Sequence, residues 1–364
     1  MLKKKKLKKK KKKKINLLNF NLIKMKDFVL KLGEKKFRAV QIMEWIYKKH
    51  CINFNKMSNL SNNLKKKLEN TSIVKLPKYI KKKKSSDGTI KWNFLFKTEF
   101  IETVYIPEKK RATLCISSQA GCILKCGFCA TGQLGYTRNL LVSEIISQIW
   151  FVINKLNQYK LKKLILPSVT NIVMMGMGEP LLNLKNIIIA IDIILGNYGF
   201  NFSKNKVTLS TSGIVPAINK IAGKIDISLA ISLHAPNDHI RNMIMPINKI
   251  YNINLLLSSV KNYLSKSTAN RGIVTIEYVM LLKINDSLHH AKELMHLLKD
   301  IPCKINLIPW NPIKNSHYQC STHKRIINFS NYLKNKNLIV TIRKNRGSDI
   351  NAACGQLISK KHVY

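Results

Sequence analysis

Three cysteines on one short segment constrain this chain more than any other feature. Cys122, Cys126 and Cys129 follow a C-x₃-C-x₂-C spacing within the glycine-containing residues 120–132. Thiolates are soft ligands that suit zinc or an iron–sulfur cluster. A structural zinc site takes four protein ligands, usually from two close pairs, so this triad fits a [4Fe–4S] cluster with one open iron better. A zinc site completed by a distant fourth ligand is the alternative that the spacing leaves open.

Strand and helix patterns alternate from about residue 112, which predicts an α/β fold. Six apolar strands with helical runs between them imply a parallel sheet covered by helices. Catalytic loops of such sheets lie at the carboxyl ends of the strands, where the cysteine segment follows the first strand. The predicted strands are residues 112–117, 171–174, 207–210, 225–233, 273–280 and 304–307, and the main helices are 141–156, 184–195, 254–264 and 288–298.

The rest of the chain divides by composition. Residues 3–14 are almost all lysine, and self-repulsion keeps such a run disordered. Apolar residues recur at helical spacing after Gly33, and Asp87-Gly88 is a hairpin signal between a Lys-rich run and a β-rich run. The predicted parts are a disordered tail at 1–25, a helical domain at 26–70, a β-hairpin linker at 71–107 with strands at 89–97 and 100–107, a main domain at 108–347 and a C-terminal segment at 348–364.

The charge of the chain predicts a polyanionic partner. The formal net charge is +46, with 64 Lys and Arg against 18 Asp and Glu, which favours RNA or DNA. Compositional drift toward lysine explains part of the excess, but it does not by itself explain so few acids. The eight cysteines are too sparse and too clustered for a disulfide framework, which indicates a reducing, cytoplasmic compartment. No apolar run reaches the ~18 residues of a membrane span.

Polar residues follow several of the predicted strands. Gly178 and Glu179 come after the second strand, where a glycine allows close backbone approach and a carboxylate can accept hydrogen bonds from an ammonium group. Each of the other polar residues is by itself more often a turn or cap residue. Together, around one mouth, they suit a ribose and an adenine. They are Ser210, the Ser232-Leu233-His234 run and Asn311, after the third, fourth and sixth strands.

The cysteine spacing resembles the signature of the radical S-adenosylmethionine enzymes. Five further segments resemble one subfamily, the RlmN-type RNA adenine-C2 methyltransferases. The resemblance covers residues 37–355, nearly the whole chain beyond the lysine-rich tail. The segments are RATLCISSQAGC at 111–122, GMGEP at 176–180, STSGIVP at 210–216, SLHAPN at 232–237 and RGSDINAAC at 346–354.

This resemblance implies a partial (βα)₆ barrel with a small helical RNA-binding domain at the N-terminus. It implies one [4Fe–4S] cluster held by the cysteine triad, and two S-adenosylmethionine molecules consumed per turnover. The implied partners are 23S ribosomal RNA, some transfer RNAs and an electron donor such as flavodoxin, with no DNA. The residues implied to contact S-adenosylmethionine are Gly178, Glu179, Ser210, Ser232, Leu233, His234 and Asn311.

Three more residues acquire roles by resemblance alone. Cys354 is the implied methyl carrier, which becomes S-methylcysteine, and Cys115 is the implied resolving cysteine, which forms a transient disulfide with it. Spacing alone favours a buried cysteine and an incidental thiol for these two positions. Glu102 is the implied proton acceptor. Alternation places it on the face shared by Phe100, Val104 and Ile106, although an edge-strand glutamate in solvent is an equal reading of the pattern.

Two other functions remain open at this point. A sister enzyme of the same architecture methylates adenine C8, and the motif residues do not separate it from the C2 enzyme. A zinc-bound RNA-binding protein without catalytic activity could use Cys115 or Cys354 as its fourth ligand. A radical methylthiotransferase fits less well, because no second cysteine triad precedes this one. The remaining cysteines, at 51, 303 and 320, match no motif and are predicted to be structural, as are the other histidines.

Overall fold

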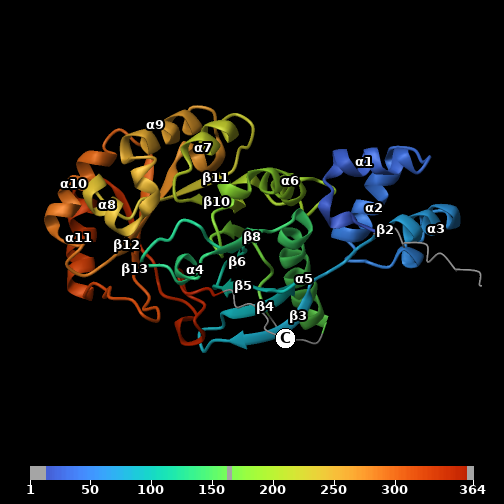
Figure 1. Ribbon diagram of the computed structural model, residues 1–364, viewed down its shortest axis with the longest axis horizontal. Coiled ribbons are helices and arrows are strands. Elements are labelled where there is room, and N and C mark those ends of the chain that lie inside the picture. Colours follow the sequence, from blue (N-terminus) through green and yellow to red (C-terminus); the bar gives the residue numbers. More distant parts are fainter. Residues whose placement is uncertain (1–13, 162–165, 359–364) are drawn as a thin grey trace, which may run out of the picture.

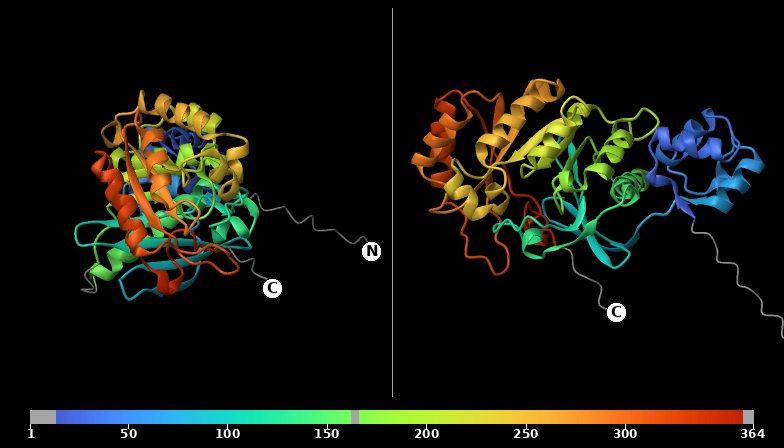
Figure 2. Two further views of the ribbon diagram at one scale, coloured as in Figure 1. Left: turned by 90° about the vertical axis from the view of Figure 1, so that its left-hand side faces the viewer. Right: turned by 45° about the horizontal axis from the view of Figure 1, so that its top comes forward.

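The computed structural model describes residues 14–161 and 166–358 (Figure 1). Most of the predicted lysine-rich run, and the end of the predicted C-terminal segment, lie outside the described residues. A small helical unit occupies one end of the molecule, and the mixed sheet with its covering helices forms the larger remainder (Figures 1 and 2). In the part of the chain that is described, no helix combines the length and the apolar character needed to cross a bilayer.

The helical unit begins earlier than the composition predicted. The disordered tail was expected to extend to residue 25, but residues from Ile15 onward form defined elements. Leu17 and Leu18 are completely buried, and the Asn21 side chain accepts from the backbone N of Lys24 (3.1 Å), which caps the first helix. The elements are β1 (Ile15–Asn16), η1 (Leu17–Asn19), α1 (Leu22–Lys31), α2 (Phe37–Tyr47), η2 (Phe54–Lys56), α3 (Asn62–Thr71) and β2 (Ser72–Ile73).

A ten-stranded sheet forms the main body. Its order is β14-β13-β12-β11-β10-β9-β6-β5-β4-β3. All neighbours from β6 to β14 are parallel, whereas β3, β4 and β5 are antiparallel. The strands are β3 (Lys78–Lys84), β4 (Ile90–Phe96), β5 (Glu99–Pro107), β6 (Ala112–Cys115), β9 (Asn171–Met174), β10 (Val207–Thr211), β11 (Ser228–Ser232), β12 (Val274–Met280), β13 (Cys303–Pro309) and β14 (Ile339–Ile342).

The predicted hairpin linker is part of this sheet. Its turn lies between β3 and β4 as predicted, but β5 also pairs with β6, with Tyr105 opposite Leu114. Trp92, Phe94 and Ile101 are buried, so the apolar face of the hairpin packs as core and does not span a gap between domains. β14, a seventh parallel strand beside β13, was not predicted from the sequence.

The parallel strands curve as a partial barrel, and helices cover its outside (Figure 2). β12 is buried at every position, as expected for a strand with packing on both faces. The helices are α5 (Val142–Leu161), α6 (Leu184–Leu195), α7 (Val215–Ile221), α8 (Asp238–Ile244), α9 (Ile253–Leu264), α10 (Leu288–Leu298) and α11 (His323–Asn335). Short elements at the strand ends include β7 (Gln119–Gly121), α4 (Ala130–Gln133), β8 (Tyr136–Asn139), η3 (Pro180–Asn183) and η7 (Ser348–Ile350).

Candidate functional site

A cavity of about 620 Å³ opens at the carboxyl ends of the parallel strands. It gathers most of the predicted site residues from segments that are far apart in the sequence. Leu233 and Glu102 are absent from its lining. Leu233 is fully buried beside it, with its backbone N donating to the Glu277 carbonyl (3.1 Å). The predicted residues that line the cavity are Cys115, Cys122, Cys126, Cys129, Gly178, Glu179, Ser210, Ser232, His234, Asn311 and Cys354.

The cysteine triad lies on a loop with a tightly fixed backbone. Gly121 has φ +77°, and a Cβ there would lie 2.0 Å from the Gly135 carbonyl oxygen, so only glycine fits. The next residue, Cys122, donates its backbone N–H to that same carbonyl (2.8 Å). The N–H of Gly127 donates to the carbonyl of Ile244 at the end of α8 (3.1 Å). The loop is therefore pinned on both sides before its helix α4 begins.

The chemistry of this triad fits an iron–sulfur cluster. Burial raises the pKa of Cys122 to about 12 and that of Cys126 well above the usual range, so the free thiols hold their protons and ligation would release them. Among the described residues, no three His, Cys, Asp or Glu side chains lie close enough together to bind one metal ion. A cluster makes no such demand, because each cysteine binds a different iron. Three donors leave one iron for another ligand.

Glu179 is held beside the triad by its neighbours. Its carboxylate accepts from the backbone N–H groups of Leu181 (3.0 Å) and Ser212 (2.8 Å). Burial raises its pKa, and these hydrogen bonds oppose that rise. Gly178, just before it, has φ +92°, and a Cβ there would lie 2.4 Å from the Cβ of Gln119. The predicted close approach of backbone at this motif is therefore present.

A buried arginine organises the ends of β10 and β11. The Arg241 side chain is 0% exposed and donates to the carbonyls of Ser212 (2.7 Å), Ser232 (3.1 Å) and Leu233 (3.1 Å). It also donates to Asn248 Oδ1 (2.7 Å). Burial lowers its pKa to about 10, and Cys126 and Asp238 oppose that shift. The backbone that would face a bound nucleoside thus depends on one guanidinium.

His234 and Asn311 contact other parts of the site. His234 Nδ1 accepts from the backbone N of Val279 (3.0 Å), and its ring lies 4.8 Å from the Phe128 ring in the cysteine loop. Burial, followed by Arg241, lowers the pKa of His234 to about 3, so the imidazole is neutral. Asn311 Nδ2 donates to the Cys354 carbonyl (3.2 Å). These two residues therefore connect β11 and β13 to the cysteine loop and the C-terminal segment.

Cys354 and Cys115 both face the cavity as free thiols. Burial raises the pKa of Cys115 to about 12, and the nearby Cys354 adds to that rise. Cys354 is exposed to the cavity, but the protein around its thiol shields it from water and so raises its pKa. The charge of Arg343 acts in the opposite direction and lowers the pKa of both thiols. The C-terminal segment lies against α4, where the N–H of Ala130 donates to the Gly355 carbonyl (2.7 Å).

Glu102 lies on the predicted strand face but does not open into the cavity. Val104 and Ile106 on the same face line the cavity. The Glu102 carboxylate, 4% exposed, instead pairs with Lys91 (2.9 Å) and accepts from the backbone N of Ile358 (3.0 Å). The alternative of a solvent-exposed edge glutamate is therefore wrong.

Four buried or half-buried charged residues in or next to the described site were not predicted from the sequence. Glu277 accepts from Asn306 Nδ2 (2.9 Å); burial raises its pKa, and Arg343 opposes that rise. A charged residue inside an otherwise apolar strand was the available signal for Glu277 and for Lys91. Arg343 follows β14, the strand that was missed, and Arg241 lies on a short helix with no distinctive pattern.

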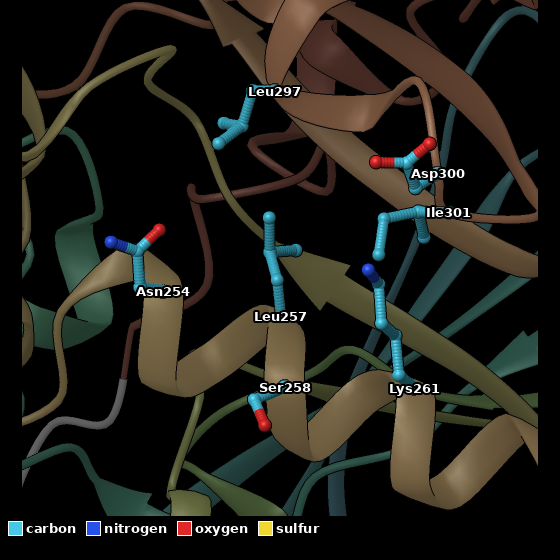
Figure 3. A pocket seen from close by; sticks show the side chains of 7 residues that line it. All are labelled: Asn254, Leu257, Ser258, Lys261, Leu297, Asp300 and Ile301. Carbon is cyan, nitrogen blue, oxygen red and sulfur yellow. The ribbon is translucent and has the colours of Figure 1, made fainter.

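A second, smaller pocket lies outside the barrel. It has a volume of about 280 Å³ between α9 and α10, and Figure 3 shows its lining side chains. None of the motif residues reaches it, so it is separate from the site described above. It is lined by Asn254, Leu257, Ser258, Lys261, Leu297, Asp300 and Ile301.

Comparisons with known proteins agree with this geometry. Residues 15–74 match the family described as "Ribosomal RNA large subunit methyltransferase N-terminal domain", and residues 116–298 match the "Radical SAM superfamily". The solved structure of a radical SAM methyltransferase from Sphaerobacter thermophilus superimposes with a TM-score of 0.86 at 34% identity, covering 94% of this chain and 98% of that one.

Curated relatives carry the resemblance over nearly the full length. A protein named "Dual-specificity RNA methyltransferase RlmN" from Buchnera aphidicola subsp. Cinara cedri is 77% identical, with 95% of this chain and 96% of that protein covered. The same name belongs to a relative from Buchnera aphidicola subsp. Schizaphis graminum, 60% identical over 94% of this chain and 93% of its own length. The chain therefore belongs to the RlmN family of radical S-adenosylmethionine RNA methyltransferases.

Proposed function

We propose that this chain methylates C2 of one adenine in 23S ribosomal RNA and of adenine 37 in some transfer RNAs. One observation carries the proposal. Two free thiols outside the triad, Cys115 and Cys354, share one cavity with the triad, in a chain 77% identical to a dual-specificity RNA methyltransferase. A zinc-bound binding module would need only one of these two thiols, as the fourth ligand of its metal. The family membership also disfavours the zinc-bound alternative.

The target atom explains why thiols and a radical source are needed together. Adenine C2 is an electron-poor aromatic carbon without a nucleophilic lone pair, so it cannot attack a methyl sulfonium directly. The [4Fe–4S] cluster with S-adenosylmethionine supplies a 5′-deoxyadenosyl radical. In this proposal Cys122, Cys126 and Cys129 hold the cluster. Gly178 and Glu179 hold the methionyl amine, and the polar strand ends hold the ribose and the adenine through Ser210, Ser232, Leu233, His234 and Asn311.

The other residues of the site act on the methyl group and on the product. Cys354 accepts a methyl group on its sulfur, and the radical would remove a hydrogen atom from that methyl group so that its carbon can bond to C2. Glu102 takes the C2 proton of the adduct, and the one electron left over would return to the cluster. Cys115 then attacks the Cys354 sulfur and a disulfide forms. The bond between that sulfur and the transferred carbon breaks with its electron pair on carbon, and the carbon takes up a proton to become the methyl group of the product. A thiol reductant resets the pair, in keeping with the reducing compartment expected from the cysteine usage. Arg343 favours the thiolate form of both cysteines.

The basic surface supports an RNA partner. A net charge of +46 attracts the phosphate backbone without sequence preference. The helical unit, β1 to β2, would hold the folded RNA, with the target base flipped into the cavity. An electron donor such as flavodoxin, a cytoplasmic location and the absence of a DNA substrate belong to the same proposal.

Isotope transfer to the carrier cysteine tests the proposed chemistry. Reconstituted holoenzyme would be incubated with S-adenosylmethionine bearing a deuterated methyl group, without RNA, and its peptides analysed by mass spectrometry. The label is expected on Cys354 and absent from the Cys354→Ala variant. A Cys320→Ala variant is the matched control, because that cysteine lies outside the cavity lining, and it should label normally. RNA methylation that continues in Cys354→Ala would overturn the carrier role.

A further inference from the structure

We propose that Lys91 is a positioning residue for the methyl-carrier segment, an inference that builds on the proposed role of Cys354. Lys91 and Glu102 form an ion pair on neighbouring strands, which we call the Lys91–Glu102 clasp. The clasp holds residues 351–358 at both ends and so keeps Cys354, in the middle of that segment, over the cavity. In Figure 1 the C-terminal segment, in red, lies beside β4 and β5.

The contacts of the clasp are on the two sides of Cys354. Lys91 Nζ donates to the carbonyl of Asn351 (2.8 Å), three residues before the cysteine. Glu102 Oε2 accepts from the backbone N of Ile358 (3.0 Å), four residues after it. The two side chains join each other through Lys91 Nζ and Glu102 Oε1 (2.9 Å). Both ends of the carrier segment are thus tied to one buried pair.

The position of Lys91 on its strand makes this role specific. Lys91 is opposite Val104 on β5 and opposite Lys83 on β3. Glu102 is therefore its diagonal neighbour, within reach of a long side chain. The Lys91 side chain is 7% exposed, whereas Lys83 is exposed. A buried ammonium requires a counter-charge and further hydrogen-bond acceptors, and here the second acceptor comes from the carrier segment.

The pair is complete only when the segment is seated. Without residues 351–358, Lys91 would lose one of its two acceptors, and Glu102 Oε2 would lose the backbone donor of Ile358. The residues just before the segment are also held by this hairpin. Ser85 Oγ donates to Asp349 Oδ1 (2.6 Å), and Gly347 N–H donates to Asp87 Oδ2 (2.9 Å). The antiparallel strands therefore serve as the platform on which the segment rests.

The clasp depends on the charge of Glu102. A proton on this carboxylate would remove the counter-charge of Lys91 while leaving an oxygen that can still accept a hydrogen bond. Because Glu102 is also the proposed proton acceptor, accepting the substrate proton would loosen the segment at the stage when Cys115 must reach the Cys354 sulfur. The Glu102→Gln substitution mimics this neutral state and should loosen residues 351–358 as Lys91→Met does.

The test measures the mobility of the segment in full-length holoenzyme. Hydrogen–deuterium exchange of peptides covering 347–358, and the rate at which iodoacetamide alkylates Cys354, would be compared between wild type and Lys91→Met. Both rates are expected to rise about tenfold, as for the loss of one hydrogen bond to a charged group, while exchange in β12 and β13 is unchanged. Lys83→Met is the matched control and should leave both rates as in wild type. Unchanged rates in Lys91→Met would overturn the proposal.

Two further variants separate positioning from simple loss of stability. Lys91→Met/Glu102→Gln carries no unpaired buried charge, so its free energy of unfolding should recover toward wild type while Cys354 stays readily alkylated. If the free energy of unfolding and the alkylation rate of Cys354 both returned to their wild-type values, a positioning role would be refuted. Ile358→Pro removes only the donor to Glu102 and keeps the ion pair; if Lys91→Met fails to fold, faster exchange at 351–357 in Ile358→Pro supports the clasp, and unchanged exchange contradicts it.

These measurements do not depend on the reaction itself. Exchange and alkylation need neither RNA nor turnover. Wild-type enzyme without RNA methylation, together with a loosened Lys91→Met segment, would refute the proposed function and keep the clasp. Methylation by wild type, together with an unaffected Lys91→Met segment, would refute the clasp and keep the function.

Discussion

Replacing Arg241 by methionine should damage both the fold and the cofactor site, because one buried side chain supports four acceptors. The guanidinium donates to three carbonyls at the ends of β10 and β11 and to the Asn248 side chain. Methionine fills a similar volume but donates nothing. The Arg241→Met variant therefore leaves these acceptors buried without donors, on the loops proposed to contact S-adenosylmethionine.

The magnitude follows from those four acceptors. A buried acceptor without a partner costs roughly 1–3 kcal/mol, so the lower limit for four is about 4 kcal/mol. Removing a buried charge offsets part of this loss, which leaves a net destabilisation of about 3 kcal/mol. That is a large fraction of the roughly 5–15 kcal/mol that holds a typical protein folded. Lysine at this position keeps the charge but has a smaller reach. The stability of Arg241→Lys should therefore lie between that of wild type and that of Arg241→Met.

Urea unfolding and equilibrium dialysis of S-adenosylmethionine would measure the two effects. Arg241→Met is expected to unfold at lower urea concentration with an unchanged slope, and to bind S-adenosylmethionine at least about tenfold more weakly. Arg271→Met is the matched control, because the same substitution there removes an exposed side chain. If Arg241→Met kept its stability within about 1 kcal/mol and bound the cofactor normally, the assigned role of this arginine would be wrong.

Three other substitutions test separate parts of the site. Gly178→Ala should lose S-adenosylmethionine binding, because its Cβ would meet Gln119 at 2.4 Å. Gly135→Ala is the control: φ is positive there too, but its Cβ would meet nothing, so it shows the effect of backbone strain alone, about 1–3 kcal/mol. Cys115→Ala should trap protein covalently joined to RNA, visible as a shifted band on a denaturing gel, and free multiple turnover would contradict its resolving role. Arg343→Met should raise the pKa of Cys354, so the pH profile of its alkylation should move upward; an unmoved profile would show that Arg343 does not act on this thiol.

Local patterns predicted the parallel core well, for a physical reason. A strand such as β12 is buried on both faces, and its sequence is mostly apolar apart from Glu277 and one threonine. The glycines at 121 and 178 mark turns that only glycine can make. β14 was missed because Ile339 and Thr341 are exposed and the strand is the last one in the described sheet, next to β13. Its short, half-exposed pattern carries little signal.

Partners that are remote in the sequence could not be predicted in this way. The strands of the hairpin were predicted, but a periodicity does not say that β5 pairs with β6, so the hairpin was interpreted as a linker. Likewise, the face of Glu102 was predicted, but its ion pair with Lys91 depends on strand register, and its contact with Ile358 depends on where the chain returns 256 residues later. Long-range contacts of this kind complete the site.

Nucleoside mass spectrometry would identify the product that this chain makes on RNA. Ribosomal and transfer RNA would be isolated from cells that lack their own C2 and C8 adenine methylases and express this protein. 2-Methyladenosine is expected in both RNA classes, and it should be absent from cells expressing Cys354→Ala. 8-Methyladenosine would assign the chain the reaction of the sister enzyme. Neither product, from soluble protein that carries its iron, would contradict the proposed chemistry.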